Sequence, residues 1–398
     1  MSTFAQTITA QPKGTAVTTT VMTGGSSGFG AIAVRQLAQA SGTRPLLGAR
    51  SPEDGAVRLD LRSLDSVRAF SGSVRERLGE TRIDALVLNA GTVQPDDTGR
   101  SADGYETTFA VNHLAHYLLI RLLMPALADR ARVVVTTSGT HDPTTGASLQ
   151  TPRHADADLL AHPDRDPGRH TRPKKAGEHA YTASKLCAVL TARALHAHPD
   201  IQARHITVIA YDPGQVFGTG LARDLAPHLR IAWSVLGTPL GAPLRRLNGN
   251  LNTPAAAGQA LAQLALGAVT PPDGRIYAAL RRGKLTWLVP SDLAHSNDLA
   301  QALWADSATR RAARPRQGSA MTGAANGRVR DGHARRAWSR RVSPASRSTW
   351  LASWSRSARS AWHSASTTTT RSRSQPTVWR CRPARPPCTA VIGANHTP

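Results

Sequence analysis

Short apolar runs, many of them rich in β-branched residues, alternate with longer amphipathic stretches over much of the chain. The apolar runs lie at Ala16 to Thr23, Pro45 to Leu47, Ala85 to Leu88, Arg132 to Thr137 and Thr207 to Tyr211. The stretches with helical periodicity lie at Ala31 to Ala40, Ser63 to Leu78, Gly104 to Ala128 and Tyr181 to His196. Strands that are apolar on both faces and alternate with helices are typical of the α/β class. The pattern therefore predicts a single domain with a doubly wound parallel sheet that helices cover on both sides.

Two segments interrupt this alternation. Residues 141–179 are polar and rich in Pro, His and Asp, and we interpret them as a long surface insertion, which is usually either functional or disordered. Residues 221–252 mix apolar residues with Pro and Gly. They form either a flap over an apolar substrate pocket or an ordinary packed connection. Neither segment carries a motif that identifies a substrate.

The composition changes after Trp304 to Arg, Ser, Ala, Pro and Thr, without apolar periodicity. Residues 310–398 contain 18 arginines, no lysine and one acid, so they carry most of the formal net charge of +23. A segment without periodic apolar surface cannot offset its conformational entropy by packing. We therefore expect an extension at 1–14, one folded domain at 15–308 and a disordered tail at 309–398.

Two other interpretations of the tail stay open. Its arginines are interleaved with five of the chain's eight tryptophans, and charge combined with base stacking is the means by which proteins bind single-stranded nucleic acids. A tail that uses arginine without lysine is also what a shifted reading frame in GC-rich coding sequence would produce. Without the tail the chain is only mildly basic, so nucleic acid is not the partner that we favour.

Cysteine usage and hydropathy exclude several classes of protein. The three cysteines are Cys187, Cys381 and Cys388. They are too few and too scattered for a disulfide framework or a tetrahedral zinc site, which favours a reducing cytoplasm and no metal. The longest apolar stretch, Leu114 to Ala128, is interrupted by His116 and Arg121 and is shorter than the roughly 20 residues that a bilayer requires. We therefore expect a soluble cytoplasmic protein with no membrane span.

A glycine-rich turn follows the first predicted strand and opens the first predicted helix. Its sequence is Thr23-Gly24-Gly25-Ser26-Ser27-Gly28-Phe29-Gly30. In this context a glycine loop presents backbone N–H groups and a helix N-terminus to a phosphate. Gly24 suits the tight turn, Gly28 suits the approach of a pyrophosphate to the backbone, and Gly30 suits close packing of the helix on the strand. We interpret the whole loop as the site for the phosphates of a dinucleotide, and an ordinary Gly/Ser turn is the alternative.

The residues after the second strand indicate which dinucleotide binds. The chain reads Leu47-Gly48-Ala49-Arg50, without the acid that binds the ribose 2′-hydroxyl in an NAD site. Arg50 suits a 2′-phosphate, so NADP(H) is favoured over NAD(H); an exposed surface arginine is the alternative. Asp60 ends a short apolar stretch. It either accepts a hydrogen bond from the adenine amino group or caps the helix that begins near Ser63.

The segment Tyr181-Thr182-Ala183-Ser184-Lys185 lies at the start of the last of these predicted helices. A spacing of four places the phenol and the ammonium on one helix face. A nearby ammonium favours the phenolate and lowers a tyrosine pKa from about 10 towards neutrality. Such a tyrosine can exchange a proton with a carbonyl oxygen while a hydride moves at carbon. An amphipathic helix with an incidental Tyr and Lys is the alternative.

Two further polar residues lie where they can serve the same chemistry. Ser138 directly follows the strand that ends at Thr137, and its hydroxyl can hold the reacting oxygen near Tyr181. An incidental loop serine is the alternative. Asn112 lies in an apolar helical stretch, where a buried amide needs a partner. It can order a water that relays protons to Lys185.

Taken together, these residues resemble the short-chain dehydrogenase/reductase family. The motifs that carry the resemblance occur in the family's order and are Thr23-Gly24-x-x-x-Gly28-x-Gly30, Asn89-Ala90-Gly91, Asn112, Ser138, Tyr181-x-x-x-Lys185 and Pro213-Gly214. The resemblance implies a Rossmann-type sheet, a nicotinamide cofactor, and reduction of a carbonyl or oxidation of an alcohol. It also implies that Asn89-Ala90-Gly91 supports the sheet beside the adenine ribose and that Pro213-Gly214 with Thr219 borders the nicotinamide.

Other segments look most like the retinol dehydrogenase and protochlorophyllide reductase-like branch of that family. They are Asp103-Gly104-Tyr105-Glu106, Val111-Asn112-His113-Leu114-Ala115-His116-Tyr117 and Ser184-Lys185-Leu186-Cys187. The 43 positions from Ser138 to Tyr181 fit that branch as well. Gln215 stands where a cysteine is expected in light-dependent protochlorophyllide reductase, so the resemblance extends to fold and cofactor and not to photochemistry. The Arg-rich tail has no counterpart in the family pattern.

The interpretation that we favour is an NADP(H)-dependent oxidoreductase acting on a carbonyl or secondary alcohol of an apolar small molecule, with Tyr181 as general acid and base. A non-catalytic NADP-binding regulator is the first alternative, although such a protein need not retain all four of Asn112, Ser138, Tyr181 and Lys185. A nucleic-acid-associated protein that binds through its tail is the second. Homo-oligomers are common in the family, and the sequence leaves the oligomeric state and the reaction direction open.

Overall fold

The structure, a computed structural model, describes residues 18–41, 45–52, 55–216 and 248–312. The predicted extension at 1–14, Thr219, most of the predicted flap at 221–252 and the tail beyond Ala312 lie outside the described residues. Within the described ranges, no helix combines the length and the apolar character needed to span a membrane.

The central sheet has eight strands in the order β10-β9-β6-β5-β4-β1-β2-β3. Their bounds are β1 Thr20–Thr23, β2 Leu46–Ala49, β3 Val57–Arg58, β4 Ile83–Leu88, β5 Leu127–Thr136, β6 Thr207–Asp212, β9 Tyr277–Arg281 and β10 Lys284–Trp287. Neighbouring strands pair in parallel, except β10, which pairs antiparallel with β9 at one edge. This order confirms the predicted doubly wound, Rossmann-type sheet. Its direction of winding reverses between β1 and β4, where such sheets bind ligands at the carboxyl ends of the strands.

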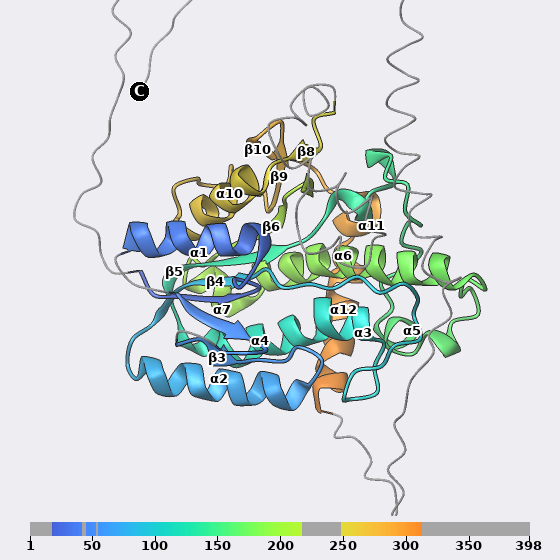
Figure 1. Ribbon diagram of the computed structural model, residues 1–398, viewed down its shortest axis with the longest axis horizontal. Helices are drawn as coiled ribbons and strands as arrows, with labels where there is room; N and C mark the ends of the chain where they lie inside the picture. Colours follow the sequence, from blue (N-terminus) through green and yellow to red (C-terminus); the bar gives the residue numbers. More distant parts are fainter. Residues whose placement is uncertain (1–17, 42–44, 53–54, 217–247, 313–398) are drawn as a thin grey trace, which may run out of the picture. The chain divides into compact units, whose positions relative to one another are not determined.

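Helices cover both faces of the sheet (Figure 1). One face carries α1 Gly28–Ser41 and α10 Pro254–Leu266, and the other carries α2 Leu64–Leu78, α4 Ala115–Leu123, α6 Pro173–His196 and α12 Asn297–Ala312. Successive strand residues point to opposite faces. Val21 therefore belongs to the core under α2, α4 and α6, whereas Met22 belongs to the core under α1 and α10.

The remaining described elements are short. The helices are α3 Thr107–Phe109, α5 Ala157–Ala161, α7 Pro199–Ala203 and α11 Asp292–His295, and a second, two-stranded sheet pairs β7 Gln215–Val216 with β8 Leu251–Asn252.

The prediction of one continuous helix from Gly104 to Ala128 is wrong. It consists of α3, a π-helical turn over Ala110–Leu114, α4, and a 3₁₀ turn over Met124–Ala126. Strand β5 already begins at Leu127. Pro125 explains the early end, because proline cannot donate the backbone hydrogen bond that would continue an α-helix.

The helix that carries Tyr181 is longer than predicted, because α6 begins at Pro173, eight residues earlier. Proline is well suited to the first helical position, where no N–H partner is required. The expected surface insertion at 141–179 therefore contributes the first turns of α6. The same segment includes α5, whose Ala157, Leu160 and Ala161 side chains are buried, so it is an ordered part of the domain that packs against the core.

Candidate active site

The glycine loop leaves β1 in a conformation that requires glycine at two positions. Gly24 and Gly28 have φ values of 70° and 59°, in the left-handed region that other residues rarely adopt. A Cβ atom added at Gly24 would lie 2.6 Å from the backbone nitrogen of Ala90. A Cβ atom at Gly30 would overlap the Gly24 carbonyl oxygen, so the expected close packing at Gly30 is confirmed. Ser26 and Ser27, at the tip of the loop, are exposed.

Polar side chains fasten this loop to the neighbouring strands. Thr23 Oγ1 accepts hydrogen bonds from the backbone N–H groups of Asn89 and Ala90, both at 3.1 Å. Asn89 Nδ2 donates to the Gly24 carbonyl at 2.9 Å, and Thr136 Oγ1 donates to Asn89 Oδ1 at 3.0 Å. Thr23 and Asn89, which we expected near the cofactor, thus hold the carboxyl ends of β1, β4 and β5 together.

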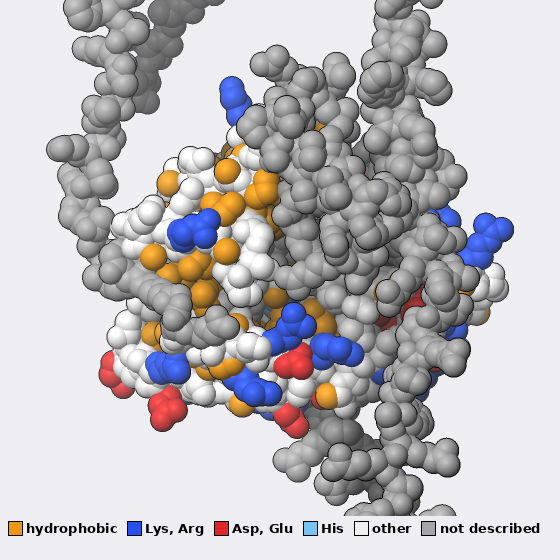
Figure 2. Space-filling view, in the orientation of Figure 1, with side chains coloured by type: hydrophobic (Ala, Val, Ile, Leu, Met, Phe, Trp, Pro, Cys, Tyr) orange, Lys and Arg blue, Asp and Glu red, His pale blue; other side chains and the backbone are white. Residues whose placement is uncertain are grey.

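Arg50 and Asp60 follow two strands at the same edge of the fold. Arg50 comes directly after β2, the neighbour of β1, and it is exposed. Further exposed arginines lie at 58 and 62, and basic side chains are visible among acidic ones over β3 and α2 in Figure 2. Asp60 Oδ1 accepts a hydrogen bond from the backbone N–H of Arg62 at 3.0 Å.

The idea that Asp60 caps α2 is wrong. The cap is Ser63, whose Oγ accepts a hydrogen bond from the Ser66 N–H at 3.2 Å. Asp60 stabilises the turn that precedes this cap. Its other predicted function, accepting a hydrogen bond from the adenine amino group, stays a prediction.

Tyr181 and Lys185 lie on one face of α6, as their spacing predicts. Lys185 Nζ is 5.7 Å from the centre of the Tyr181 ring and donates to the Thr136 carbonyl at 3.3 Å. Thr137 Oγ1 donates to the Lys185 carbonyl at 2.7 Å. These two contacts join α6 to the end of β5, so Lys185 is buried and fixed beneath the tyrosine.

The expectation of a Tyr181 pKa that lies below its usual value is wrong for the protein without a bound ligand. Burial raises the pKa of Tyr181 to about 12, because the phenolate loses hydration. Burial also lowers the pKa of Lys185 to about 8, and the nearby Asp212 carboxylate partly opposes that change. Tyr181 therefore keeps its proton at neutral pH.

Ser138 reaches Tyr181 from the end of β5. A hydrogen bond with the Ser138 side chain partly opposes the rise in the Tyr181 pKa. Ser138 also begins a 3₁₀ turn over Gly139–His141, and its Oγ accepts hydrogen bonds from Thr140 N and Thr140 Oγ1 at 3.4 and 3.2 Å. The structure thus brings the two predicted hydroxyl groups together.

Asn112 lies in the π-helical turn, an irregularity that the sequence analysis did not predict. Its Oδ1 accepts from Thr92 N at 2.7 Å, and its Nδ2 donates to Thr92 O and to Ser184 Oγ, both at 2.9 Å. The expected partner of this buried amide is therefore the backbone just beyond Asn89-Ala90-Gly91. A Cβ atom on Gly91 would lie 3.4 Å from Asn112 Oδ1 and 3.5 Å from Lys185 Nζ, so the two residues meet at this glycine.

His113 and His116, which lie on the π-helical turn and on α4, had no predicted role beyond the family resemblance, and both make polar contacts in the structure. His116 Nε2 lies 3.0 Å from Thr23 Oγ1, and His116 Nδ1 lies 3.3 Å from the Asn112 carbonyl oxygen. His113 Nε2 lies 2.8 Å from Ser307 Oγ of α12. Burial lowers the pKa of His116 to about 4 and that of His113 to about 3. A histidine pair at spacing three in an apolar helix is the signal that could have identified them.

Pro213-Gly214 follows β6 and is fixed by its neighbours. Gly214 has a φ of 68°, and a Cβ atom there would lie 2.6 Å from the Asn250 carbonyl oxygen. Asn252 Nδ2 donates to the Pro213 carbonyl at 3.0 Å. Thr219, the third member of this predicted group, lies outside the described residues.

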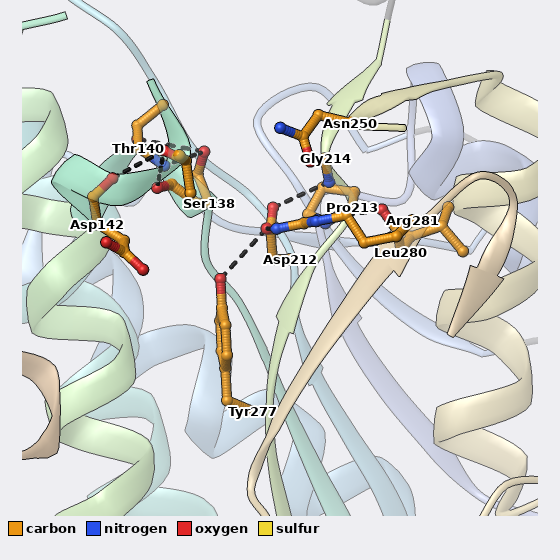
Figure 3. A network of polar contacts seen from close by, with 12 residues as sticks. Ser138, Thr140, Asp142, Asp212, Pro213, Gly214, Asn250, Tyr277, Leu280 and Arg281 are labelled. Carbon is orange, nitrogen blue, oxygen red and sulfur yellow. Dashed lines mark hydrogen bonds and ion pairs between the residues drawn. The ribbon is translucent and has the colours of Figure 1, made fainter. Parts of the chain in front are cut away.

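The sequence analysis missed Asp212, the last residue of β6. It is fully buried and lies between Arg281 and Tyr277 (Figure 3). Its Oδ2 is 2.7 Å from Arg281 Nη2 and accepts from the Tyr277 hydroxyl at 3.2 Å. An acid at the end of an apolar strand, directly before Pro213-Gly214, was the available signal. Separately, the described residues contain no group of three or more metal-ligating side chains.

Comparisons with known proteins show what the chain is similar to. Residues 18–147 match the short chain dehydrogenase family. The chain is 33% identical over 239 residues to protochlorophyllide reductase B of Oryza sativa subsp. japonica, covering 54% of this chain and 59% of that protein. It is 33% identical over 249 residues to dehydrogenase/reductase SDR family member 13 of Bos taurus, covering 56% of this chain and 59% of that protein. The matches thus span less than two thirds of either relative.

A solved structure of an uncharacterized protein from Mycobacterium paratuberculosis resembles the chain over a longer stretch. The identity is 25%, the TM-score is 0.51, and the likeness covers 74% of this chain and 94% of that one. The sheet order, the motifs in their expected places and these similarities lead to one family. The described residues therefore have the fold of a short-chain dehydrogenase/reductase, and residues 18–147 carry the match to that family.

Proposed function

We propose that the chain is an NADP(H)-dependent oxidoreductase that transfers a hydride between the nicotinamide and a carbonyl or secondary alcohol of an apolar small molecule. The observation that carries the proposal is the assembly of Tyr181, Ser138 and Lys185 at the carboxyl end of β5. The glycine loop follows β1 at the same edge of the parallel sheet, so a dinucleotide bound there extends towards these groups. The names of the similar rice and cattle proteins, both of which include the word reductase, add support.

The loop fits a dinucleotide because its glycines leave backbone exposed where side chains would otherwise lie. Gly24 and Gly30 tolerate no Cβ atom, and the N-terminus of α1 directly follows exposed Ser26 and Ser27. When bound, the nicotinamide supplies or accepts the hydride. In this proposal the phosphates contact the Thr23 to Gly30 loop, the adenosine lies beside Asp60 and Asn89-Ala90-Gly91, and the nicotinamide lies beside Pro213-Gly214.

The site residues have distinct tasks in carbonyl reduction. Tyr181 is protonated at neutral pH because burial raises its pKa, so it acts as the general acid towards the carbonyl oxygen. The Ser138 hydroxyl holds that oxygen next to the phenol. Lys185 places a positive charge beneath the tyrosine that stabilises the phenolate formed when the proton leaves. Asn112 keeps the backbone after β4 in place against Lys185, and a water ordered there for proton relay remains part of the proposal.

Cofactor preference can be tested by fluorescence titration of the full chain with NADPH and NADH. Arg50 is exposed at the end of β2, where no acid follows Ala49, so we expect tighter binding of NADPH. Arg50→Ala should weaken NADPH binding by about tenfold or more and leave NADH binding unchanged, because a charge-assisted contact to phosphate is worth more than about 1.4 kcal/mol. Arg75→Ala, which removes an exposed arginine of α2, is the matched control. Equal affinity for both dinucleotides would contradict the NADP(H) assignment.

Turnover can be tested with a panel of apolar aldehydes, ketones and secondary alcohols. Tyr181→Phe should lower kcat by about 10² to 10⁴ because it removes the proton donor, while NADPH affinity stays within about twofold. Tyr105→Phe removes a phenol that donates to the Arg310 carbonyl and should retain turnover. Binding of NADPH without turnover across the panel would favour the non-catalytic regulator. Failure of the full chain and of a chain ending at residue 312 to bind either dinucleotide would remove the enzyme proposal.

The cytoplasmic location and the domain limits stay predictions from sequence, and the oligomeric state stays open. Binding of nucleic acid by the tail stays the less favoured alternative, which salt-dependent binding lost on deletion of residues 313–398 would support.

A further inference from the structure

The ion pair between the buried Asp212 and the partly exposed Arg281 lies beside the turn that carries the proposed catalytic Ser138. Asp212 ends β6 and Arg281 ends the adjacent strand β9. The Asp212 carboxylate receives three contacts, from Arg281 Nη2 at 2.7 Å, from the Tyr277 hydroxyl at 3.2 Å and from the Gly214 N–H at 2.9 Å. Figure 3 shows the carboxylate between these donors and the turn that carries Ser138. A carboxylate that is fully buried and held by three donors is a built feature, because leaving it unpaired would be costly.

The ion pair also contacts the turn that begins at Ser138. A Cβ atom on Gly139 would lie 2.9 Å from Asp212 Oδ2 and 3.4 Å from Arg281 Nη2, so the backbone beside Ser138 rests on the pair. His141 closes the same turn, with Nδ1 2.7 Å from the Ser138 carbonyl oxygen. The His141 ring packs edge-on against the Tyr277 ring, with centroids 5.4 Å apart. A movement of the pair would therefore displace the Ser138 turn.

The ion pair also contacts the turn Pro213-Gly214, which borders the proposed nicotinamide site. The Gly214 N–H donates to Asp212 Oδ1, and Arg281 Nη1 donates to the Leu280 carbonyl, which also accepts from Asn252 Nδ2. Asn252 in turn donates to the Pro213 carbonyl. One ion pair thus connects the two turns that flank the site, after β5 and after β6.

Asp212 is a charge that acts on the proposed acid and on its lysine. Its negative charge opposes loss of a proton from both groups, and so raises the pKa of Tyr181 and of Lys185. Arg281 carries the compensating positive charge. The titratable and charged groups around Asp212 among the described residues are His141 and Asp142 of the turns after β5, Tyr181 and Lys185 of α6, Tyr211 of β6, and Tyr277 and Arg281 of β9.

We propose that Asp212 and Arg281 form a positioning pair for the proposed reaction: the pair holds the Ser138 and Pro213-Gly214 turns in one arrangement and sets the net charge that faces Tyr181 and Lys185. The proposal rests on the proposed function for its catalytic meaning, but the geometry and the charge can be tested without turnover. Neither residue touches the reacting atoms in this view; both act through their neighbours.

Removing the charge of Asp212 and removing that of Arg281 should shift the pH dependence of kcat in opposite directions. Asp212→Asn keeps the shape and removes the negative charge, so the alkaline limb of kcat should move to lower pH. Arg281→Met leaves Asp212 uncompensated, so the same limb should move to higher pH, and kcat should fall more than NADPH affinity. Arg281→Lys keeps the positive charge, so its pH profile of kcat should lie closer to that of the wild type than the profile of Arg281→Met. In the double variant Asp212→Asn with Arg281→Met, the alkaline limb should lie near its wild-type position. Lys284→Met, which removes an exposed cation of β10, is the charge-matched control.

A readout independent of turnover uses the lysine itself. The chain has only five lysines, so a carbon-13 NMR titration of ε-labelled lysine can follow Lys185, assigned by its loss in Lys185→Arg. Asp212→Asn should lower the Lys185 pKa from its value of about 8, and Arg281→Met should raise it, each by about half a unit or more. These shifts are expected even if no substrate is turned over, which separates this proposal from the proposed function. Thermal unfolding confirms that each variant is folded.

The proposal is overturned if folded variants shift the Lys185 pKa in the same direction, or if neither variant shifts it. It is also overturned if kcat falls in both variants by the same factor at every pH, because that is the behaviour of a merely structural pair.

Discussion

Thr23 Oγ1 and His116 Nε2 lie 3.0 Å apart, and this contact determines which nitrogen of the histidine carries a proton. Thr23 Oγ1 already accepts two backbone N–H groups, which occupy both lone pairs of the hydroxyl. Its own proton must therefore point to His116 Nε2. The histidine is then a neutral ring with its proton on Nδ1, which faces the Asn112 carbonyl oxygen at 3.3 Å. One imidazole thus connects the glycine loop to the π-helical turn.

This relationship predicts that Thr23→Val weakens both stability and cofactor binding. The change leaves the N–H groups of Asn89 and Ala90 without an acceptor, and each unsatisfied buried group costs about 1 to 3 kcal/mol. We expect a lower free energy of unfolding in urea and weaker NADPH binding by fluorescence titration. Thr23→Ser keeps the hydroxyl and is the control. An unchanged unfolding midpoint in Thr23→Val would show that these hydrogen bonds contribute nothing.

Substitution of Gly30 in the loop, compared with substitution of Gly72 in α2, tests whether NADPH binding requires a glycine in the loop. Gly30→Ala should abolish NADPH binding, because its Cβ overlaps the Gly24 carbonyl and lies 2.7 Å from Asn89 Nδ2. Gly72→Ala, on the exposed side of α2, has no atom within 4 Å of the added Cβ and should stabilise the protein by about 0.5 to 1 kcal/mol. Thermal unfolding and NADPH titration of both variants check the pair. Normal NADPH affinity in Gly30→Ala would contradict the proposed role of the loop.

Asn112→Asp should destabilise the protein by about 2 kcal/mol or more at neutral pH. The aspartate cannot donate to the Thr92 carbonyl or to Ser184, and it places a charge in a buried position. Asn297→Asp is a matched control, because Asn297 is exposed at the start of α12 and its Oδ1 accepts from Arg193 Nη2. A carboxylate there meets both an arginine and a helix N-terminus, so stability should hold or rise. Urea unfolding measures the stability of both variants. An equal decrease in the free energy of unfolding would contradict the expectation that the buried Asn112 amide is required where it stands.

The buried histidines predict loss of stability in acid. Burial lowers the folded-state pKa to about 3 for His113, about 4 for His116 and about 3 for His179, from an ordinary value of 6.5. Below pH 6.5 the unfolded chain binds protons that the folded chain excludes, so each histidine removes about 1.4 kcal/mol per pH unit until its folded pKa is reached. Glu106 acts in the opposite sense, because burial raises its pKa to about 7 and protonation below that value relieves a buried charge.

The net expectation is a fall in the free energy of unfolding between pH 6.5 and about 4.5, with a slope of about two protons or more, because the pKa of buried His141 is lowered as well. Urea unfolding at a series of pH values measures this slope. In His179→Asn the slope should decrease by about one proton. A free energy of unfolding that stays constant over this interval would refute the expected linkage.

Local patterns in the sequence were sufficient to predict the fold and the local geometry of much of the candidate site. The alternation of apolar runs with helical stretches determines a doubly wound sheet, because a strand that is buried on both faces must be apolar throughout. The spacing of four places Tyr181 and Lys185 on one face of α6, and the loop glycines are needed where a Cβ atom finds no room. These are properties of neighbouring residues, so they can be read without knowing the fold.

The tertiary structure alone decided contacts between residues that are distant in the chain. The pairing of Asp212 with Arg281 spans 69 positions and that of Thr23 with His116 spans 93, and no local period indicates either. The early start of α6 and the π-helical turn at Asn112 depend on packing that overrides local preference. The direction of the Tyr181 pKa shift depends on burial by the surrounding fold, which sequence spacing does not reveal. Sequence by itself thus predicted which groups form the candidate site, whereas burial and long-range pairing decided their charge and their support.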